Sequence, residues 1–406
     1  MRTKFVLIIG DGMADRPLSE LGGRTPLQAA RKPHMDGIAA RGRCGLVRTV
    51  AEGFEPGSDV ATLGLLGYDV KACYTGRAPI EAAAMGVAMG PHDVAVRTNL
   101  VWLKEGRMAD YSAGHIPSRD GKKLIAELDR QLGKRGEIEF HAGVSYRNLL
   151  VLRQHYSDAV QLTPPHDIPG QEVAPHLPRA RSPAGRRTAE LLNNLITASQ
   201  RILSAHPLNS EKAARGEPHA NSVWFWGIGR KPAFEPFERK WGLRAAVISA
   251  VDLIKGMGVL TGMSVINVPG ATGYLDTNYE GKANAALLAL RSHDLVIVHI
   301  EATDETGHEG DAGKKVRAIE NLDARIIAPL LKGLERSGWD YVVAVSPDHE
   351  TPIALRTHAS SPVPFAMWRK GENNDNRCAY DEHCGQAEQA ISGTDFMRLF
   401  LSLGKQ

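Results

Sequence analysis

Three short segments of the chain place carboxylate and imidazole side chains directly after apolar runs of strand length. VLIIGDGMAD carries Asp11, LVIVHIEATDETGHEGD carries Asp304 and His308, and YVVAVSPDHETP carries Asp348 and His349. Because ligands of open parallel sheets bind beyond the carboxyl ends of the strands, we expect these three loops to lie close together. Mixed nitrogen and oxygen donors favour two borderline divalent cations, Mn²⁺, Zn²⁺ or Co²⁺, and make Mg²⁺ the second choice.

Each of these residues has an ordinary structural alternative when it is taken singly. An aspartate after a strand is more often a helix N-cap or a turn residue, and His308 could simply pair with Asp304 one helical turn away. The pair Asp348 and His349 could lie in a solvated loop, and His358, in LRTHASSPVP, could be a surface or capping histidine. The combination of three aspartates and three histidines favours metal binding.

A candidate nucleophile lies in the segment EPGSDVATLGLLGYD. Gly57 permits a sharp turn, and the residues that follow it are typical of a helix, so Ser58 is expected at a helix N-terminus, where exposed N–H groups favour anions. The motif alone favours a plain N-cap serine. Beside a metal, however, a serine can lose its proton and attack phosphorus.

These motifs, taken together, resemble those of the archaeal-type, cofactor-independent phosphoglycerate mutases of the alkaline phosphatase superfamily. The similar segments run through nearly the whole chain: DGMAD, PGSDVATLGLLGYD, GRAPIEAAAMG, YRNLLVL, PPHDIPGQ, ISAVDLIKGMG, VPGATGYLDTNYEGKANAAL, TDETGHEGD, SPDHETP and THASSPVP. The resemblance implies two metal sites, and none of the seven positions departs from the family pattern. One site would be formed by Asp11, Ser58, Asp348 and His349, and the other by Asp304, His308 and His358.

The resemblance also implies a reaction in two halves. Ser58 would take the phosphate from 3-phosphoglycerate, the glycerate would turn within a closed site, and the phosphoserine would return the phosphate to the other hydroxyl, without 2,3-bisphosphoglycerate as cofactor. Two alternatives stay open. One is a metal-dependent phosphatase or phosphotransferase acting on another small hydroxy acid or phosphonate, because the metal loops define the chemistry and not the acceptor. The other is a non-catalytic paralogue that binds a metal or a metabolite.

A substrate with a doubly anionic phosphate and a carboxylate needs several basic partners. The family-like motifs contain four such residues, although each of them alone is more often a surface charge: Arg77, Arg97, Arg147 and Lys255. Arg147 lies in a predicted insertion together with His166 and Asp167, so closure of that insertion could carry these residues to the substrate.

The expected fold class is α/β, with an alkaline-phosphatase-like sheet sandwiched by helices and an inserted, smaller α+β lid domain. Val- and Ile-rich runs predict buried parallel strands at 5–9, 223–226, 245–248, 295–300 and 341–345, and amphipathic spacing predicts helices over about 281–292 and 316–334. A probable hairpin (138–152) and a helix (about 185–205) fall in the insertion. The predicted division is therefore 1–111 with 219–406 for the metal-binding domain, and 112–218 for the lid.

Composition places the chain among ordinary folded proteins. Of 406 residues, 43% are hydrophobic and 23% are charged, and 49 basic against 46 acidic residues give a net charge of +3. Such a balance favours neither a nucleic-acid nor a membrane partner. The family resemblance implies that the partner is a small phosphorylated acid. No apolar stretch approaches the roughly 18 residues of a membrane span, and the N-terminal run is too short for a signal peptide.

The four cysteines are too few for a disulfide framework and favour reduced thiols, which predicts a cytoplasmic protein. Cys378, His383 and Cys384 could bind zinc. Three ligands without a fourth, however, favour a loop that carries free thiols.

Overall fold

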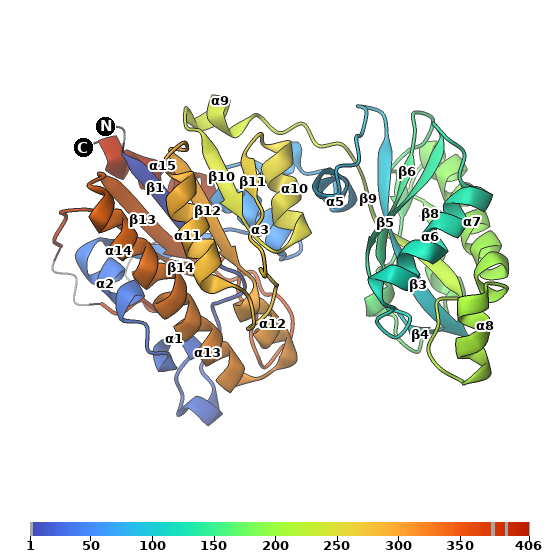
Figure 1. Ribbon diagram of the computed structural model, residues 1–406, viewed down its shortest axis with the longest axis horizontal. Coiled ribbons are helices and arrows are strands. Elements are labelled where there is room, and N and C mark those ends of the chain that lie inside the picture. Colours follow the sequence, from blue (N-terminus) through green and yellow to red (C-terminus); the bar gives the residue numbers. More distant parts are fainter. Residues whose placement is uncertain (1–2, 375–377, 386–388, 406) are drawn as a thin grey trace. The chain divides into compact units, whose positions relative to one another are not determined.

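The computed structural model describes residues 3–374, 378–385 and 389–405, and it divides the chain into two compact units (Figure 1). The first unit contains Met1–Tyr74 and Phe234–Gln406, and the second contains Thr75–Ala233. Within the described ranges, every helix is too short or too polar to cross a bilayer.

The first unit is built on an eight-stranded sheet with the order β11-β10-β12-β1-β13-β14-β2-β15. All neighbouring pairs are parallel except those that β14 makes with β13 and β2. Its strands are β1 (Lys4–Gly10), β2 (Arg43–Arg48), β10 (Ala245–Ile248), β11 (Ser264–Ile266), β12 (Leu295–Ile300), β13 (Tyr341–Ser346), β14 (Val363–Arg369) and β15 (Ile391–Ser392). The central strands β12, β1 and β13 are apolar and almost fully buried, as parallel strands covered on both faces must be.

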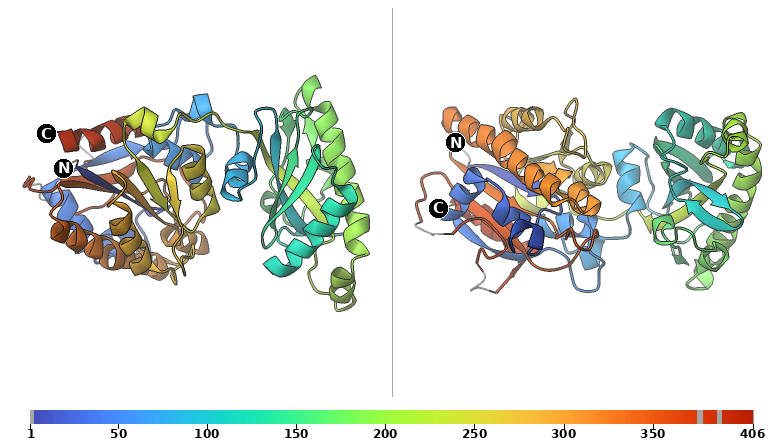
Figure 2. Two further views of the ribbon diagram at one scale, coloured as in Figure 1. Left: turned by 45° about the horizontal axis from the view of Figure 1, so that its top comes forward. Right: turned by 90° about the horizontal axis from the view of Figure 1, so that it is seen from below.

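Helices cover both faces of this sheet. On one face, Val6 and Ile8 of β1 belong to a core that also contains residues of α2, α11, α13 and α14. On the other face lies α15, the C-terminal red helix of Figure 2. There Phe5 packs edge-on against Phe400 of α15. The helices of the unit are α1 (Pro26–Ala29), α2 (Pro33–Arg41), α3 (Ser58–Leu65), α4 (Val70–Cys73), α9 (Phe237–Trp241), α10 (Asp252–Leu260), α11 (Tyr279–Ala289), α12 (Ala302–Glu309), α13 (Ala312–Leu322), α14 (Ala328–Ser337) and α15 (Gly393–Ser402).

The second unit is an α+β structure with a five-stranded antiparallel sheet, in which β3 pairs with β4, β6 and β9, and β6 pairs with β5. Residues of α6 and α7 form one core with one face of the sheet (Figure 1). The elements are α5 (Ala78–Ala84), β3 (Val94–Lys104), β4 (Arg107–Asp110), α6 (Ser118–Leu132), β5 (Ile138–Val144), β6 (Arg147–Leu152), α7 (Arg186–Ser204), α8 (Pro207–Ala214) and β9 (Ser222–Arg230), with a small two-stranded sheet of β7 (Val160–Gln161) and β8 (Arg179–Ala180).

This unit is wider than the predicted insertion at 112–218. The reason is strand pairing: β3 begins at Val94 and pairs along most of its length with both β6 and β9, so the sheet cannot be divided between two domains. The run 223–226 was therefore assigned to the wrong sheet, because it lies in antiparallel β9 and not in a parallel strand of the first unit.

The α/β class and most individual elements are confirmed. The hairpin is β5 and β6, and the helix at 185–205 is α7. The helix expected over 316–334 is part of a longer helical run, in which α13 and α14 are joined by a π-helical segment, Asp323–Ile327. In that segment Asp323 is buried, and its carboxylate accepts the N–H groups of His34 and Met35 at the start of α2.

Candidate active site

The carboxyl ends of three neighbouring strands bring the predicted ligands together. β1 lies between β12 and β13, with Gly10 opposite Ile300 and Ile9 opposite Ser346. Asp11 follows β1 directly, and the pair Asp348 and His349 follows β13 after one further residue. Helix α12 begins two residues after β12, which places Asp304 in its first turn and His308 in its last.

One group of side chains surrounds the Ser58 hydroxyl. Its Oγ lies 3.3 Å from both carboxylate oxygens of Asp11 and 3.2 Å from Nε2 of His349. The same Nε2 lies 3.3 Å from Asp11 and 3.8 Å from Oδ2 of Asp348. Thr62, one turn along α3, donates its hydroxyl to that Oδ2. All four predicted residues of the first metal site are therefore in contact, and all are buried.

Ser58 is the first residue of α3 and does not act as its cap. Gly57 occupies the capping position with extended backbone, and no side chain caps the helix there. The hydroxyl is instead turned to Asp11 and His349. The alternative of a plain N-cap serine is wrong.

A second group contains Asp304 and two histidines. Nε2 of His308 lies 3.1 Å from Asp304, Nε2 of His358 lies 3.6 Å from the same carboxylate, and the two Nε2 atoms are 3.0 Å apart. The two groups adjoin, because the rings of His349 and His358 have their centroids 4.2 Å apart. The ligand atoms of Asp11, Asp304 and His349 also lie within 4.8 Å of one another.

The three histidines share one hydrogen-bonding arrangement. Nδ1 of His308 contacts the Arg356 carbonyl at 3.0 Å, Nδ1 of His349 the Glu350 carbonyl at 3.2 Å, and Nδ1 of His358 the Pro56 carbonyl at 3.2 Å. A carbonyl can only accept, so each Nδ1 must carry the proton. In all three residues Nε2 therefore faces the carboxylates and is the ring atom left to bind a cation, which is how proteins orient histidines that ligate metals.

The buried carboxylates need a positive partner. Burial and the proximity of Asp348 and Asp304 raise the pKa of Asp11 well above its usual value. Burial acts the same way on Asp304, but hydrogen bonds from His308 and His358 outweigh it and hold the pKa of Asp304 well below its usual value. Carboxylates, neutral imidazoles and a hydroxyl in contact are the donor set of a divalent-cation site, and these residues fit two such ions.

Three residues that the sequence reasoning missed contribute to this site. His299, buried within β12, has its Nε2 3.1 Å from Asp11. Burial lowers the pKa of His299 to about 4, so its imidazole is neutral at physiological pH. Thr351 donates its hydroxyl to Asp304. Gly12 has a φ of +57°, and a Cβ there would overlap the side chains of Thr351 and Asp304. Two signals in the sequence could have pointed to these residues. His299 is a histidine in an otherwise apolar strand, and Gly12 follows Asp11 in a DG dipeptide.

Four of the predicted substrate-binding residues gather within the second unit. Arg97 is buried, bonds Glu81 at 2.9 Å, and stacks its guanidinium 3.7 Å from the ring centroid of Trp226. His166 also contacts Trp226, with the two ring centroids 4.9 Å apart. Burial, with repulsion from Arg77 and Arg147, lowers the pKa of Arg97 to about 10 although Glu81 opposes this. We call Arg77, Arg97, Arg147 and His166 the basic group.

The last two predicted residues belong to different units. Asp167 is exposed, with its carboxylate 3.7 Å from His166. Lys255 belongs to the first unit, on α10, where its ammonium lies 3.7 Å from Asp252.

Comparison with known proteins identifies close relatives over nearly the whole chain. A family model described as 2,3-bisphosphoglycerate-independent phosphoglycerate mutase matches residues 39–209. A protein of that name from Methanosarcina acetivorans is 51% identical over 366 residues, which cover 90% of each chain. A "probable" enzyme of the same name from Geobacter sulfurreducens is 48% identical over 408 residues, covering 99% of this chain and 100% of the relative.

Two solved structures are also similar to this chain over its whole length. The cofactor-independent phosphoglycerate mutase of Thermoplasma acidophilum is similar with a TM-score of 0.69 at 30% identity, and 100% of each chain is covered. A protein of Pyrococcus horikoshii is similar with a TM-score of 0.83 at 29% identity, over 100% of this chain and 98% of that one.

The backbone at Gly12 provides a test of the metal site. We expect Gly12→Ala to lose at least one of two bound Mn²⁺ ions per chain, measured by elemental analysis after dialysis, because the new methyl group would displace the Asp304 carboxylate. Gly22→Ala is the matched control, since Gly22 also has a positive φ, +68°, but nothing within 4 Å of the new Cβ. Both variants carry a backbone strain of about 1–2 kcal/mol. Equal Mn²⁺ content in the two variants would contradict this geometry.

The second group also predicts how metal affinity depends on pH. Burial lowers the pKa of His308, but the hydrogen bond to Asp304 outweighs it and raises that pKa to about 9. A cation must displace this proton, so affinity for Mn²⁺ should rise about tenfold per pH unit up to about pH 9 and then level off. Calorimetry in buffers of different ionisation enthalpy should find about one proton fewer released by His308→Ala than by the parent. An affinity independent of pH in this range would show that His308 is not a ligand.

Proposed function

Because the chain belongs to the family of 2,3-bisphosphoglycerate-independent phosphoglycerate mutases, we propose that it interconverts 3-phosphoglycerate and 2-phosphoglycerate through a phosphoserine at Ser58. The observation that supports this most directly is the Ser58 hydroxyl itself, which is buried at the start of α3 between Asp11 and His349. No 2,3-bisphosphoglycerate takes part.

Two divalent cations belong to the proposal. Asp11, Ser58, Asp348 and His349 would hold one, and Asp304, His308 and His358 the other. When bound, the cations stabilise the negative charge that develops on the oxygens around phosphorus. The mixture of imidazole and carboxylate donors favours Mn²⁺, Co²⁺ or Zn²⁺ over Mg²⁺.

In the first half of the reaction Oγ of Ser58 attacks the phosphorus of 3-phosphoglycerate. An O–P bond to Ser58 forms, and the bond between phosphorus and the substrate oxygen breaks. The Asp11 carboxylate, both oxygens of which lie 3.3 Å from Oγ, accepts the Ser58 proton, and the departing glycerate oxygen takes up a proton in exchange. The N–H groups in the first turn of α3 face the transferred phosphate, where the helix dipole favours an anion. The second half reverses these steps on the other glycerate hydroxyl.

The second unit serves as the lid in this proposal. Water competes with glycerate for the phosphoserine, so a mutase must enclose the glycerate until the return transfer. The basic group supplies cationic partners for the anionic substrate, and burial of Arg97 beside two other cations makes an incoming anion favourable there. Lys255 from the first unit and Asp167 are the remaining candidates for substrate contacts.

The cytoplasm is the compartment that we propose. None of the four cysteines forms a disulfide, which fits a reducing environment.

The nucleophile is tested by Ser58→Ala. Removing Oγ should abolish formation of 2-phosphoglycerate, followed by phosphorus NMR, and should remove the phosphopeptide seen by mass spectrometry of the quenched parent. Ser19→Ala is the control, because Ser19 is likewise the first residue of a short helix but is exposed. Ser58→Ala activity within about tenfold of the parent, a difference of only about 1.4 kcal/mol in the barrier, would exclude the phosphoserine route.

The lid is tested by Arg147→Ala. Arg147 is exposed at the start of β6 and contributes positive charge to the basic group. Weaker closure should divert turnover to hydrolysis, so the ratio of free phosphate to 2-phosphoglycerate formed from 3-phosphoglycerate should rise. Arg201→Ala, an exposed arginine on α7, should leave the ratio unchanged. If Arg147→Ala changes neither the product ratio nor the rate, Arg147 is only a surface charge. If the parent protein itself releases only phosphate from 3-phosphoglycerate, the enzyme is a phosphatase and not a mutase.

A further inference from the structure

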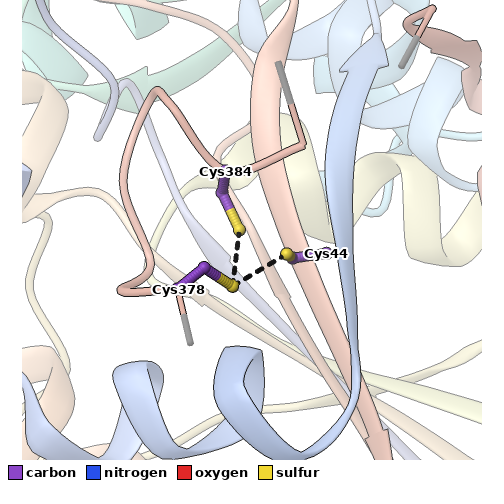
Figure 3. Close-up of side chains that lie close together, drawn as sticks. All are labelled: Cys44, Cys378 and Cys384. Carbon is purple, nitrogen blue, oxygen red and sulfur yellow. Dashed lines mark hydrogen bonds between the residues drawn. The ribbon is translucent and has the colours of Figure 1, made fainter. Parts of the chain in front are cut away.

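Three thiols converge in the first unit, and none of them belongs to the residues assigned to catalysis (Figure 3). The Sγ of Cys378 lies 3.2 Å from that of Cys44 and 3.9 Å from that of Cys384. All three sulfurs lie within 4.8 Å of one another and point toward a common centre. We call Cys44, Cys378 and Cys384 the thiol cluster.

The cluster joins segments that are distant in the sequence. Cys44 lies in β2, opposite Ala366 of β14, while the other two cysteines lie in the loop that follows β14. Because Cys44 is so distant in the sequence, the sequence analysis did not group it with Cys378 and Cys384 and favoured free thiols in this loop. The third ligand considered then, His383, is exposed and is not among the grouped donors, whereas Cys44 replaces it from 334 positions away.

Local backbone structure holds the thiols at this spacing. Gly385 has a φ of +73°, and a Cβ on it would overlap the Cα of Gly45, so the residues after Cys384 and Cys44 are in direct backbone contact. Tyr380 is fully buried, and it donates its hydroxyl to the Pro364 carbonyl and its N–H to the Asp36 carboxylate. The described part of the loop, 378–385, is thus anchored on both sides of the cluster.

The spacing fits a tetrahedral thiolate site. A zinc–sulfur bond of about 2.3 Å places two sulfurs of a tetrahedron about 3.8 Å apart, and the measured separations of 3.2 and 3.9 Å lie on either side of that value. A disulfide would use only two of the three sulfurs and would leave the convergence of the third unexplained. Cys384 is buried and the other two thiols are half-buried, so water competes only weakly for a cation at the centre.

We propose that the thiol cluster is a third metal site, which binds one soft divalent cation of the Zn²⁺ type through three thiolates, with a water as the fourth ligand. Each ligating thiol gives its proton to the solvent. Without a cation, burial and the neighbouring Cys44 raise the pKa of Cys378 to about 11, so the metal-free Cys378 thiol is protonated at neutral pH.

A cation here would fix a loop that contacts the catalytic segments. Glu382, between the two loop cysteines, accepts the Asp15 N–H at 3.0 Å and the Thr25 hydroxyl at 2.6 Å. The Asp15 carboxylate pairs with buried Lys315 at 2.8 Å and accepts the N–H of Ile353. The site is therefore structural, and it supports the loops that follow β1 and β13 without touching the substrate.

Cobalt spectroscopy on the full chain tests the proposal, since thiolate–Co²⁺ bonds absorb strongly in the near ultraviolet and the catalytic donors contain no sulfur. Reduced parent protein loaded with Co²⁺ should show this charge-transfer band, and a chelator should remove it reversibly. Cys384→Ser should lose the band and about one equivalent of bound Co²⁺. Cys73→Ser should keep both, because Cys73 is a half-buried thiol on α4 outside the cluster.

Three results would overturn the proposal. One is the absence of the band in reduced parent protein that binds Co²⁺, and another is a band that persists in Cys384→Ser. The third is a disulfide, found if protein unfolded without reductant has two titratable thiols and not four. Circular dichroism shows whether each variant has folded. If Cys384→Ser does not fold, the proposal is still tested by the Co²⁺ band of the unaltered chain and its reversible removal by the chelator. Activity is not the readout, and a negative result here leaves the mutase assignment intact.

Discussion

The burial of three carboxylates beyond the carboxyl ends of three central parallel strands is the constraint on which the rest of the site depends. Asp11, Asp304 and Asp348 are 1%, 5% and 0% exposed, and histidines are the basic residues that lie against them in the described structure. Removing such charges from water without compensation is costly. In the proposed mechanism divalent cations provide the compensation, and the same cations would make the buried Ser58 reactive toward a phosphate ester.

The fold supplies this constraint through strand order. Because β1 lies between β12 and β13 and all three are parallel, their carboxyl ends deliver ligands to one place without any long excursion of the chain. Backbone carbonyls then fix the three histidines of the proposed metal sites, since each is bonded through Nδ1 and presents Nε2. Precision therefore comes from the rigid scaffold, and a small displacement such as a methyl group at Gly12 is expected to be costly.

The sequence was most informative where local chemistry and strand ends coincide. Asp11, Asp304 and Asp348 follow apolar runs, so both their placement and their chemistry could be predicted. The role of His299 could not be predicted, because a histidine inside an apolar strand looks like a core residue until its contact with Asp11, next to β1, is known. The boundaries of the second unit depend on the pairing of β3 with β9, which are distant in the sequence. The contact of Cys44 with Cys378 likewise joins residues 334 positions apart. Such non-local contacts leave no periodic signal.

Anomalous diffraction from crystals loaded with Mn²⁺ tests the central claim most directly, because it locates each ion independently of any assumption about its ligands. The account predicts two adjacent peaks, one bounded by Asp11, Ser58, Asp348 and His349, and the other by Asp304, His308 and His358. A single peak, or two peaks neither of which lies beside Ser58, would contradict it.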